Sequence, residues 1–125
     1  MPSAQHRRLA LVIEDDDSLR LMMCEMLELA GFETYGCRDG CEGLDAARRL
    51  RPSVLTLDLH MPGMDGLEVL ERLGSEDATA ALPVVVVSAY TAEGRSHFTR
   101  QVRAVVAKPF EVTELWEKVA HAADG

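Results

Sequence analysis

The stretch from Val54 to Leu73 reads VLTLDLHMPGMDGLEVLERL, an apolar run followed by a polar turn and then by an amphipathic run. The first run is short and nearly free of polar residues, which is typical of a strand buried on both faces. Asp65 with Glu68 three residues later matches the capping box that opens a helix. We therefore predict a strand over residues 54–58 and a helix over residues 66–73.

The same alternation extends in both directions along the chain. Asp16 or Asp17 is assigned to the start of the first helix, and Gly31 provides its left-handed stop. Asp39-Gly40 is predicted to be the turn that ends the second strand. The helix predicted at residues 92–100 has few apolar residues. The predicted strands cover residues 9–13, 32–37, 54–58, 84–87 and 104–107, and the predicted helices cover residues 18–30, 42–50, 66–73, 92–100 and 112–122.

Strands that alternate with helices predict an α/β fold, in which a doubly wound parallel sheet carries helices on both faces. The chain has 125 residues, an ordinary size for one domain, and we find no linker or internal repeat in it. We expect residues 1–125 to form a single domain whose core spans about residues 8–122.

Composition excludes several classes of protein. The formal net charge is −8, which disfavours binding to nucleic acid or to an anionic membrane. The N-terminal region lacks the apolar core of a signal peptide, and no apolar run is long enough to cross a bilayer, so we expect a cytoplasmic protein. The three cysteines, Cys24, Cys37 and Cys41, match no zinc spacing and are interpreted as reduced thiols.

The carboxyl ends of the strands in such a sheet form the functional crevice, and they carry the candidate site residues. Glu14 and Asp15 follow the first strand, Asp58 ends the third, Ser88 follows the fourth and Lys108 follows the fifth. Crowded carboxylates persist when a cation neutralises them, and an all-oxygen set favours Mg²⁺. A carboxylate nucleophile beside a metal, a lysine and a hydroxyl suits phosphoryl transfer to aspartate.

Four segments carry a resemblance to a known family. They are Val12-Ile13-Glu14-Asp15-Asp16, Leu57 to Gly66 (LDLHMPGMDG), Ser88-Ala89 and Lys108-Pro109-Phe110. In this order and spacing, the chain resembles a response-regulator receiver domain of bacterial two-component systems, which belongs to the CheY-like superfamily. The resemblance covers about residues 8–122.

The resemblance implies a flavodoxin-like, five-stranded sheet in the order 2-1-3-4-5 and phosphorylation of Asp58 by a sensor histidine kinase or a histidine phosphotransfer protein. It implies that Asp15 binds Mg²⁺ directly, that Glu14 acts mainly through water, and that the backbone carbonyl of His60 is a further ligand. It assigns Ser88 as the switch hydroxyl and Lys108 as the ion-pair partner of the phosphoryl group.

The family also implies a cis Lys108-Pro109 bond, and a downstream effector or a second copy of the chain that docks on the face made by the helix predicted at residues 92–100, the strand at residues 104–107 and the helix at residues 112–122. On this reading the chain is not an enzyme, because it catalyses only its own phosphorylation and dephosphorylation.

Two positions depart from the pattern of the family. Glu14 stands where the family often has aspartate, which is a common variant. Val105 stands three residues before Lys108, where the family often has an aromatic residue that turns inward as the switch hydroxyl moves. That coupling cannot operate in its ordinary form here, and Tyr90 is the alternative participant that we consider.

Two other functions stay open from the sequence. A haloacid-dehalogenase-like phosphohydrolase also uses an aspartyl nucleophile with Mg²⁺, but it needs a second aspartate two residues later, where this chain has His60. A receiver-fold binding module that never uses the phosphoryl group is the other alternative. The sequence names no cognate kinase, no pathway and no oligomeric state, and the chain is either a stand-alone receiver or part of a longer protein.

Overall fold

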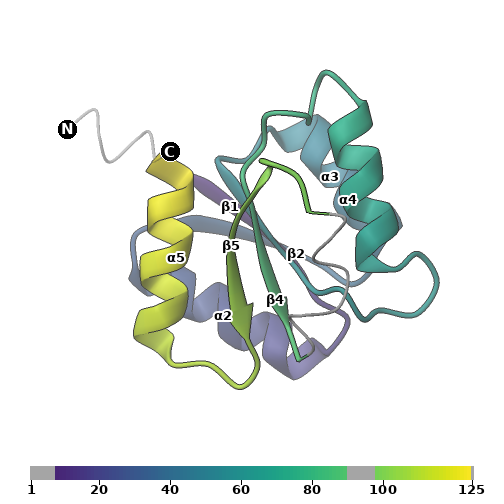
Figure 1. The fold of residues 1–125 in the computed structure, drawn as a ribbon. Coiled ribbons are helices and arrows are strands. Elements are labelled where there is room, and N and C mark those ends of the chain that lie inside the picture. Colours follow the sequence, from purple (N-terminus) through teal and green to yellow (C-terminus); the bar gives the residue numbers. More distant parts are fainter. Residues whose placement is uncertain (1–7, 90–97, 125) are drawn as a thin grey trace.

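The computed structural model describes residues 8–89 and 98–124. Strands and helices alternate from Leu9 to Ser88, and the next described elements are a strand and a helix. The two ends of the described region lie on neighbouring elements (Figure 1). In chain order the elements are β1 (Leu9–Ile13), α2 (Asp17–Leu29), β2 (Glu33–Cys37), α3 (Gly40–Leu50), β3 (Val54–Leu57), α4 (Gly66–Ser75), β4 (Val84–Ser88), β5 (Val102–Ala107) and α5 (Val112–Asp124).

The strands form one sheet in the order β2-β1-β3-β4-β5, and every described pairing is parallel. The predicted fold class and strand order are therefore confirmed. β1 pairs with β3 so that Ile13 lies opposite Leu57, and β4 pairs with β5 so that Ser88 lies opposite Ala107. This register brings the polar residues that follow β1, β3 and β5 to one edge of the sheet.

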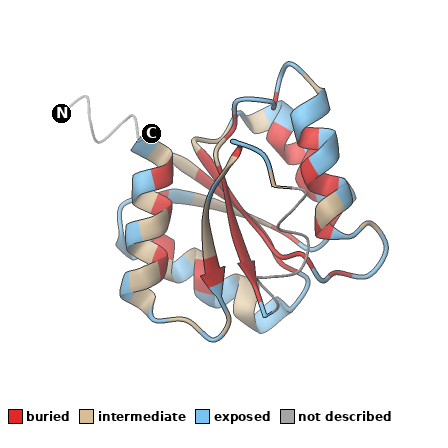
Figure 2. Cartoon of the chain, in the orientation of Figure 1, coloured by how far each residue is buried: buried red, intermediate tan, exposed pale blue. Residues whose placement is uncertain are grey.

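Helices cover both faces of the sheet (Figure 1). Side chains such as Leu11 and Ile13 pack with α3 and α4, whereas Ala10 and Val12 on the same strand pack with α2 and α5. Successive side chains of a strand point to opposite faces, so a strand between two helical layers must be apolar throughout. β1, β3 and β4 accordingly lie in the buried centre of the sheet (Figure 2).

Aspartates open three of the helices. The side chains of Asp16, Asp39 and Asp65 each accept a hydrogen bond from the backbone N–H three residues further on, at 2.8–2.9 Å. Such caps satisfy backbone donors that have no partner inside the helix. The assignment of Asp16 to the start of the first helix is confirmed. At the other end of α2, Gly31 has a φ of 101°, as the predicted left-handed stop requires.

Three local predictions differ from the structure: the turn at Asp39-Gly40, the start of β5 and the capping box at α4. Asp39-Gly40 is not a turn after β2, because Asp39 caps a helix that already begins at Gly40. β5 begins at Val102 rather than at residue 104. The capping box at α4 is only half formed, since the Glu68 carboxylate pairs with Arg72 at 3.2 Å.

The helix predicted over residues 92–100 is tested only in part. Residues 92–97 lie outside the described residues, as does Tyr90, and residues 98–100 are not helical. Val105 lies opposite Val86 and packs against the core on the side of α3 and α4.

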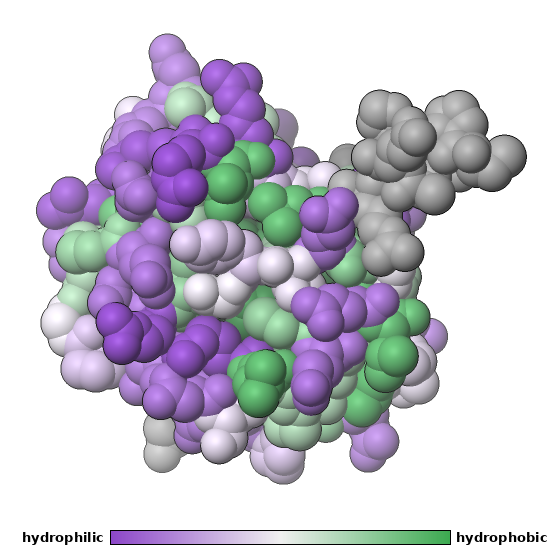
Figure 3. All heavy atoms as spheres, turned by 180° about the vertical axis from the view of Figure 1, so that it is seen from behind, coloured by the Kyte–Doolittle hydropathy of each residue, from purple (hydrophilic) through white to green (hydrophobic). Residues whose placement is uncertain are grey.

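The surface mixes hydrophilic and hydrophobic side chains, as the rear face of the molecule shows (Figure 3). The exposed large hydrophobic residues of the described chain all lie on α2, namely Leu21, Met22 and Leu29. Within residues 8–89 and 98–124, no helix is both long and apolar enough to cross a lipid bilayer.

Candidate functional site

The acidic site residues are brought together by the pairing of β1 with β3. Asp58 directly follows β3, and its N–H donates to the carbonyl of Ile13 at 3.2 Å. Glu14 directly follows β1, and its N–H donates to Cys37 on the far side at 3.0 Å. The segments after β1 and β3 leave neighbouring strands at the same edge of the sheet. The carboxylates of Glu14, Asp15 and Asp58 therefore have oxygen atoms within 4.8 Å of one another.

The three carboxylates differ in their exposure to water. Glu14 is 2% exposed and Asp58 is 4% exposed, whereas Asp15 is exposed at the rim. Buried carboxylates persist only when charges or hydrogen-bond donors compensate them. The cluster therefore depends on the groups that surround it.

Lys108 compensates part of this charge. Its Nζ donates to Glu14 Oε1 at 2.7 Å and to Asp58 Oδ2 at 3.2 Å, and its side chain is 21% exposed. β5 brings the lysine to the cluster, because the Lys108 N–H donates to the carbonyl of Ser88 at 3.1 Å and so continues the pairing of β4 with β5. The Lys108-Pro109 bond is cis, as the resemblance implied.

Burial and pairing act on these groups in opposite ways. Burial raises the pKa of Glu14, and the nearby Asp58 charge adds to this, although hydrogen bonds from Lys108 and from the Asp16 N–H partly offset the shift. Burial alone would lower the pKa of Lys108, but its contacts with Glu14 and Asp58 outweigh burial and raise that pKa. The lysine is thus held in its charged form by the two carboxylates.

Ser88 is the last residue of β4 and is fully buried. Its hydroxyl has no hydrogen-bond partner among the residues that the structure describes. A buried hydroxyl without a partner costs free energy, and such groups in native proteins call for an explanation. A ligand oxygen bound beside Lys108 would explain the buried hydroxyl, because it could accept a hydrogen bond from Ser88.

His60 contributes its backbone to the site. Its N–H donates to Asp58 Oδ1 at 3.0 Å, so the two oxygens of Asp58 are held by His60 and Lys108 respectively. The role of the His60 carbonyl as a metal ligand remains a prediction.

Arg20 belongs to the site and was missed by the sequence analysis. Its guanidinium donates to the Glu14 carbonyl at 3.0 Å and to Asp17 Oδ1 at 2.6 Å, and its side chain is 17% exposed. Gly36 on β2 leaves room for it, because a Cβ there would lie 3.1 Å from the stem of Arg20. An arginine one turn into the helix after an acidic loop was the available signal. The two hydrogen bonds hold the Glu14-Asp15 turn in place.

The residues present suit a bound Mg²⁺ ion. Three carboxylates face a single lysine, so the cluster keeps an excess of negative charge. The candidate ligands are all oxygens, which hard divalent cations prefer. Both Glu14 oxygens already accept hydrogen bonds, from Lys108 and from the Asp16 N–H, whereas the exposed Asp15 is accessible to an ion at the rim.

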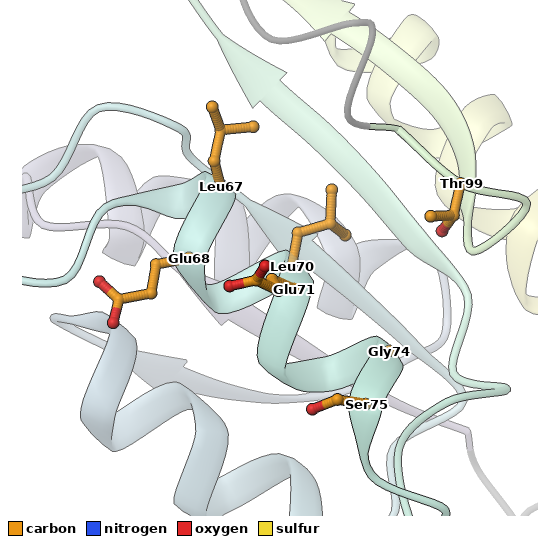
Figure 4. A pocket seen from close by; sticks show the side chains of 7 residues that line it. All are labelled: Leu67, Glu68, Leu70, Glu71, Gly74, Ser75 and Thr99. Atoms are coloured by element: carbon orange, nitrogen blue, oxygen red, sulfur yellow. The ribbon is translucent and has the colours of Figure 1, made fainter.

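A hollow of about 640 Å³ lies beside α4, away from this cluster (Figure 4). Leu67 and Leu70 point to the same side of that helix, and Thr99 faces them from the segment before β5 (Figure 4). Among the described residues that line this hollow, none is a cation that could hold a phosphoryl group and none belongs to the acidic cluster. The candidate site is therefore the cluster at the strand ends.

Comparison with known proteins agrees with this geometry. The response regulator receiver domain family matches residues 10–120. The chain is 32% identical over 111 residues to the polar-differentiation response regulator DivK of Brucella anthropi, covering 87% of this chain and 90% of DivK. A sensor protein from Polaromonas sp. JS666 has a TM-score of 0.88 at 30% identity, covering 95% of this chain and 98% of that protein.

The same fold occurs in the receiver domain of the sensor histidine kinase PA1611 from Pseudomonas aeruginosa, which has a magnesium ion coordinated in its active site cleft. Its TM-score is 0.85 at 20% identity, and the likeness covers 96% of this chain and 100% of that domain. With its sheet order, its acidic cluster and its lysine at the end of β5, this chain belongs to the response regulator receiver domain family of two-component signalling proteins.

Proposed function

We propose that Asp58 accepts a phosphoryl group from a phosphohistidine of a sensor histidine kinase or a histidine phosphotransfer protein, in a Mg²⁺-dependent reaction in the cytoplasm. The observation that carries this proposal is the bridge from Lys108 to Glu14 and Asp58, next to the Ser88 hydroxyl, which has no partner among the described residues. A half-buried cation, a carboxylate and a hydroxyl donor lie at the ends of neighbouring strands, and together they suit a tetrahedral anion.

In the transfer, one carboxylate oxygen of Asp58 forms the new bond to phosphorus. The bond between phosphorus and the histidine ring nitrogen of the donor breaks, and its electron pair returns to that nitrogen. Asp58 needs no general base, because its carboxylate attacks in the ionised form. The Lys108 ammonium and the Ser88 hydroxyl donate hydrogen bonds to the phosphoryl oxygens, which spread the developing charge.

Asp15, Asp58 and the His60 carbonyl would hold Mg²⁺, and Glu14 beside them would act mainly through water. When bound, the ion supplies positive charge that offsets the charge of the transferring group. Arg20 keeps the Glu14-Asp15 turn in place during the reaction through the Glu14 carbonyl.

The phosphodonor must reach Asp58 across the surface that surrounds the site. An apolar hollow of about 450 Å³ shares Lys108 with the site and is otherwise lined by Leu19, Met22, Met26, Pro109 and Phe110. Met22, one of the lining residues, is among the exposed large hydrophobic residues of α2. We propose that the donor protein docks here, because burial of this apolar surface would favour binding next to the acceptor.

The phosphorylated chain would act by binding a downstream effector or a second copy of itself. Supporting this, a hollow of about 400 Å³ lies where β5 meets α5 and includes Arg103, Lys118 and His121. We propose this surface of β5 and α5 as part of the output face, whose third predicted element, the helix at residues 92–100, lies mostly outside the described residues. We further propose that residues 1–125 form one receiver domain and that the chain turns over no substrate other than its own phosphoryl group.

The acceptor assignment is tested with acetyl phosphate, a small phosphodonor, and Mg²⁺. The parent chain should gain one acid-stable, base-labile phosphoryl group, detected by intact-protein mass spectrometry. Asp58→Asn should gain none. Asp77→Asn, which removes an exposed carboxylate elsewhere, serves as the control and should be labelled like the parent. Full labelling of the Asp58→Asn protein would refute the assignment.

A further inference from the structure

Gly66, the first residue of α4, lies directly against the turn that carries Asp58. A Cβ at this position would lie 2.5 Å from the backbone oxygen of Asp58, 2.5 Å from the Cα of Leu59 and 3.0 Å from Leu59 Cδ2. The two nearest atoms belong to the backbone, so no side-chain rotation could relieve the contact. A side chain at residue 66 must therefore displace the backbone of either α4 or the Asp58 turn.

The turn and the helix are connected, so this displacement would reach the acceptor. The Gly66 N–H donates to the Leu59 carbonyl at 3.1 Å, and the Asp58 N–H donates to Ile13 on β1 at 3.2 Å. The Asp58 carboxylate itself is fixed by the His60 N–H at 3.0 Å. An ordinary contact needs about 1 Å more space than the 2.5 Å available. The turn is held between β1 and α4 and is hydrogen-bonded to both, so a shift of either the turn or α4 would disturb the position of Asp58.

We propose that Gly66 is a positioning residue for the phosphoryl acceptor: its missing side chain lets α4 press against the backbone of the Asp58 turn and so sets the position of the carboxylate. This inference rests on the proposed phosphoryl transfer to Asp58. A misplacement of about 1 Å can cost about 100-fold in the rate of a reaction whose groups must be aligned.

The chain contains matched controls for this proposal. Gly40 is also confined, since a Cβ there would lie 2.6 Å from Val69 Cγ2 and 3.2 Å from the Met64 side chain, but these obstacles are side chains and not the backbone of the Asp58 turn. Among the described residues, a Cβ at Gly74, near the end of α4, would meet only Gln101 Oε1, at 3.4 Å. Gly40→Ala thus reports the cost of a packing clash, and Gly74→Ala reports the effect of alanine on the helix, which by itself is favourable.

The experiment compares the parent with Gly66→Ala, Gly40→Ala and Gly74→Ala. It measures the maximum rate of labelling at saturating acetyl phosphate and Mg²⁺, the affinity for Mg²⁺ by calorimetry, and the urea midpoint of unfolding. We expect the maximum rate of Gly66→Ala to fall about 100-fold and its Mg²⁺ affinity to fall as well. Gly40→Ala should keep the maximum rate and the Mg²⁺ affinity within about threefold of the parent, even if its urea midpoint falls as far as that of Gly66→Ala.

The outcomes separate the inference from the function on which it rests. A parent chain that takes up no phosphoryl group would refute the proposed function, and the inference with it. A labelled parent with equal rates and Mg²⁺ affinities in Gly66→Ala and Gly40→Ala would overturn the inference alone. Should Gly66→Ala melt under assay conditions, the set is repeated at lower temperature with sucrose, which favours the folded state. A protein that stays unfolded there also overturns the inference, because the clash would then not be local.

Discussion

Removal of one carboxylate from the acidic cluster should stabilise the chain when Mg²⁺ is absent. Asp15 is the best position for this test, because its side chain is exposed and its substitution by asparagine leaves no buried polar group without a partner. Its carboxylate oxygen lies within 4.8 Å of those of Glu14 and Asp58. At that distance the repulsion is about 1 kcal/mol for each pair in a water-like surrounding, and it is larger where the protein excludes water.

Asp15→Asn should therefore raise the free energy of unfolding by about 2 kcal/mol in the presence of a chelator. For a domain of this size, that corresponds to a shift of the urea midpoint by about 1 M. Added Mg²⁺ should reverse the order, because an ion that binds only the folded state stabilises the chain more the more tightly it binds, and the variant would lack a proposed ligand. The assay is urea unfolding with and without Mg²⁺, followed by the fluorescence of Trp116.

Asp77→Asn is the matched control, since it changes the net charge equally but lies outside the cluster. It should shift the midpoint little, and equally with and without Mg²⁺. The reasoning fails if Asp15→Asn is less stable than the parent in chelator, or if Mg²⁺ stabilises both proteins by the same amount.

Two further predictions concern buried side chains. Thr56→Val should stabilise the chain by about 1 kcal/mol, because the Thr56 hydroxyl is buried without a partner among the described residues, whereas Thr79→Val should destabilise it by a similar amount, because Thr79 Oγ1 donates to the Leu73 carbonyl at 2.7 Å. Equal effects of the two substitutions in urea unfolding would contradict this. Burial raises the pKa of the Cys37 thiol to about 12, so a maleimide should label the exposed Cys41 first and Cys37 only after unfolding, as peptide mass spectrometry would show. Labelling of Cys37 at the rate of Cys41 in the folded chain would argue against its burial.

The sheet and the charged part of the site could be predicted because they follow from local patterns. Apolar runs marked β1, β3 and β4, since strands between two helical layers have no polar face. The meeting of Asp58 with Lys108 then followed from the rule that parallel strands end at one edge. The structure places the lysine Nζ 3.2 Å from the aspartate.

Features that depend on tertiary contacts could not be predicted. Asp39-Gly40 is a common turn signal, but in the structure the Asp39 carboxylate caps the N-terminus of α3. Arg20 reaches the Glu14 carbonyl only because Gly36 on another strand leaves space for its stem. From the sequence, Gly66 is only a residue of low helix propensity. The structure shows why a glycine is needed there, because the backbone of the Asp58 turn lies against it.

The site departs from the rules that the rest of the chain obeys, and these departures have a common physical meaning. Glu14 and Asp58 are buried carboxylates, and together with the exposed Asp15 they share one lysine, Lys108. The Ser88 hydroxyl has no hydrogen-bond partner in the described part of the chain. Each departure weakens the fold without a ligand, and each would be relieved by a cation and a phosphoryl group bound at the same place. Ligands that relieve such strain bind the folded state with that much more free energy. A cluster that was fully compensated by the protein itself would be more stable, and it would bind Mg²⁺ and hold a phosphoryl group less tightly.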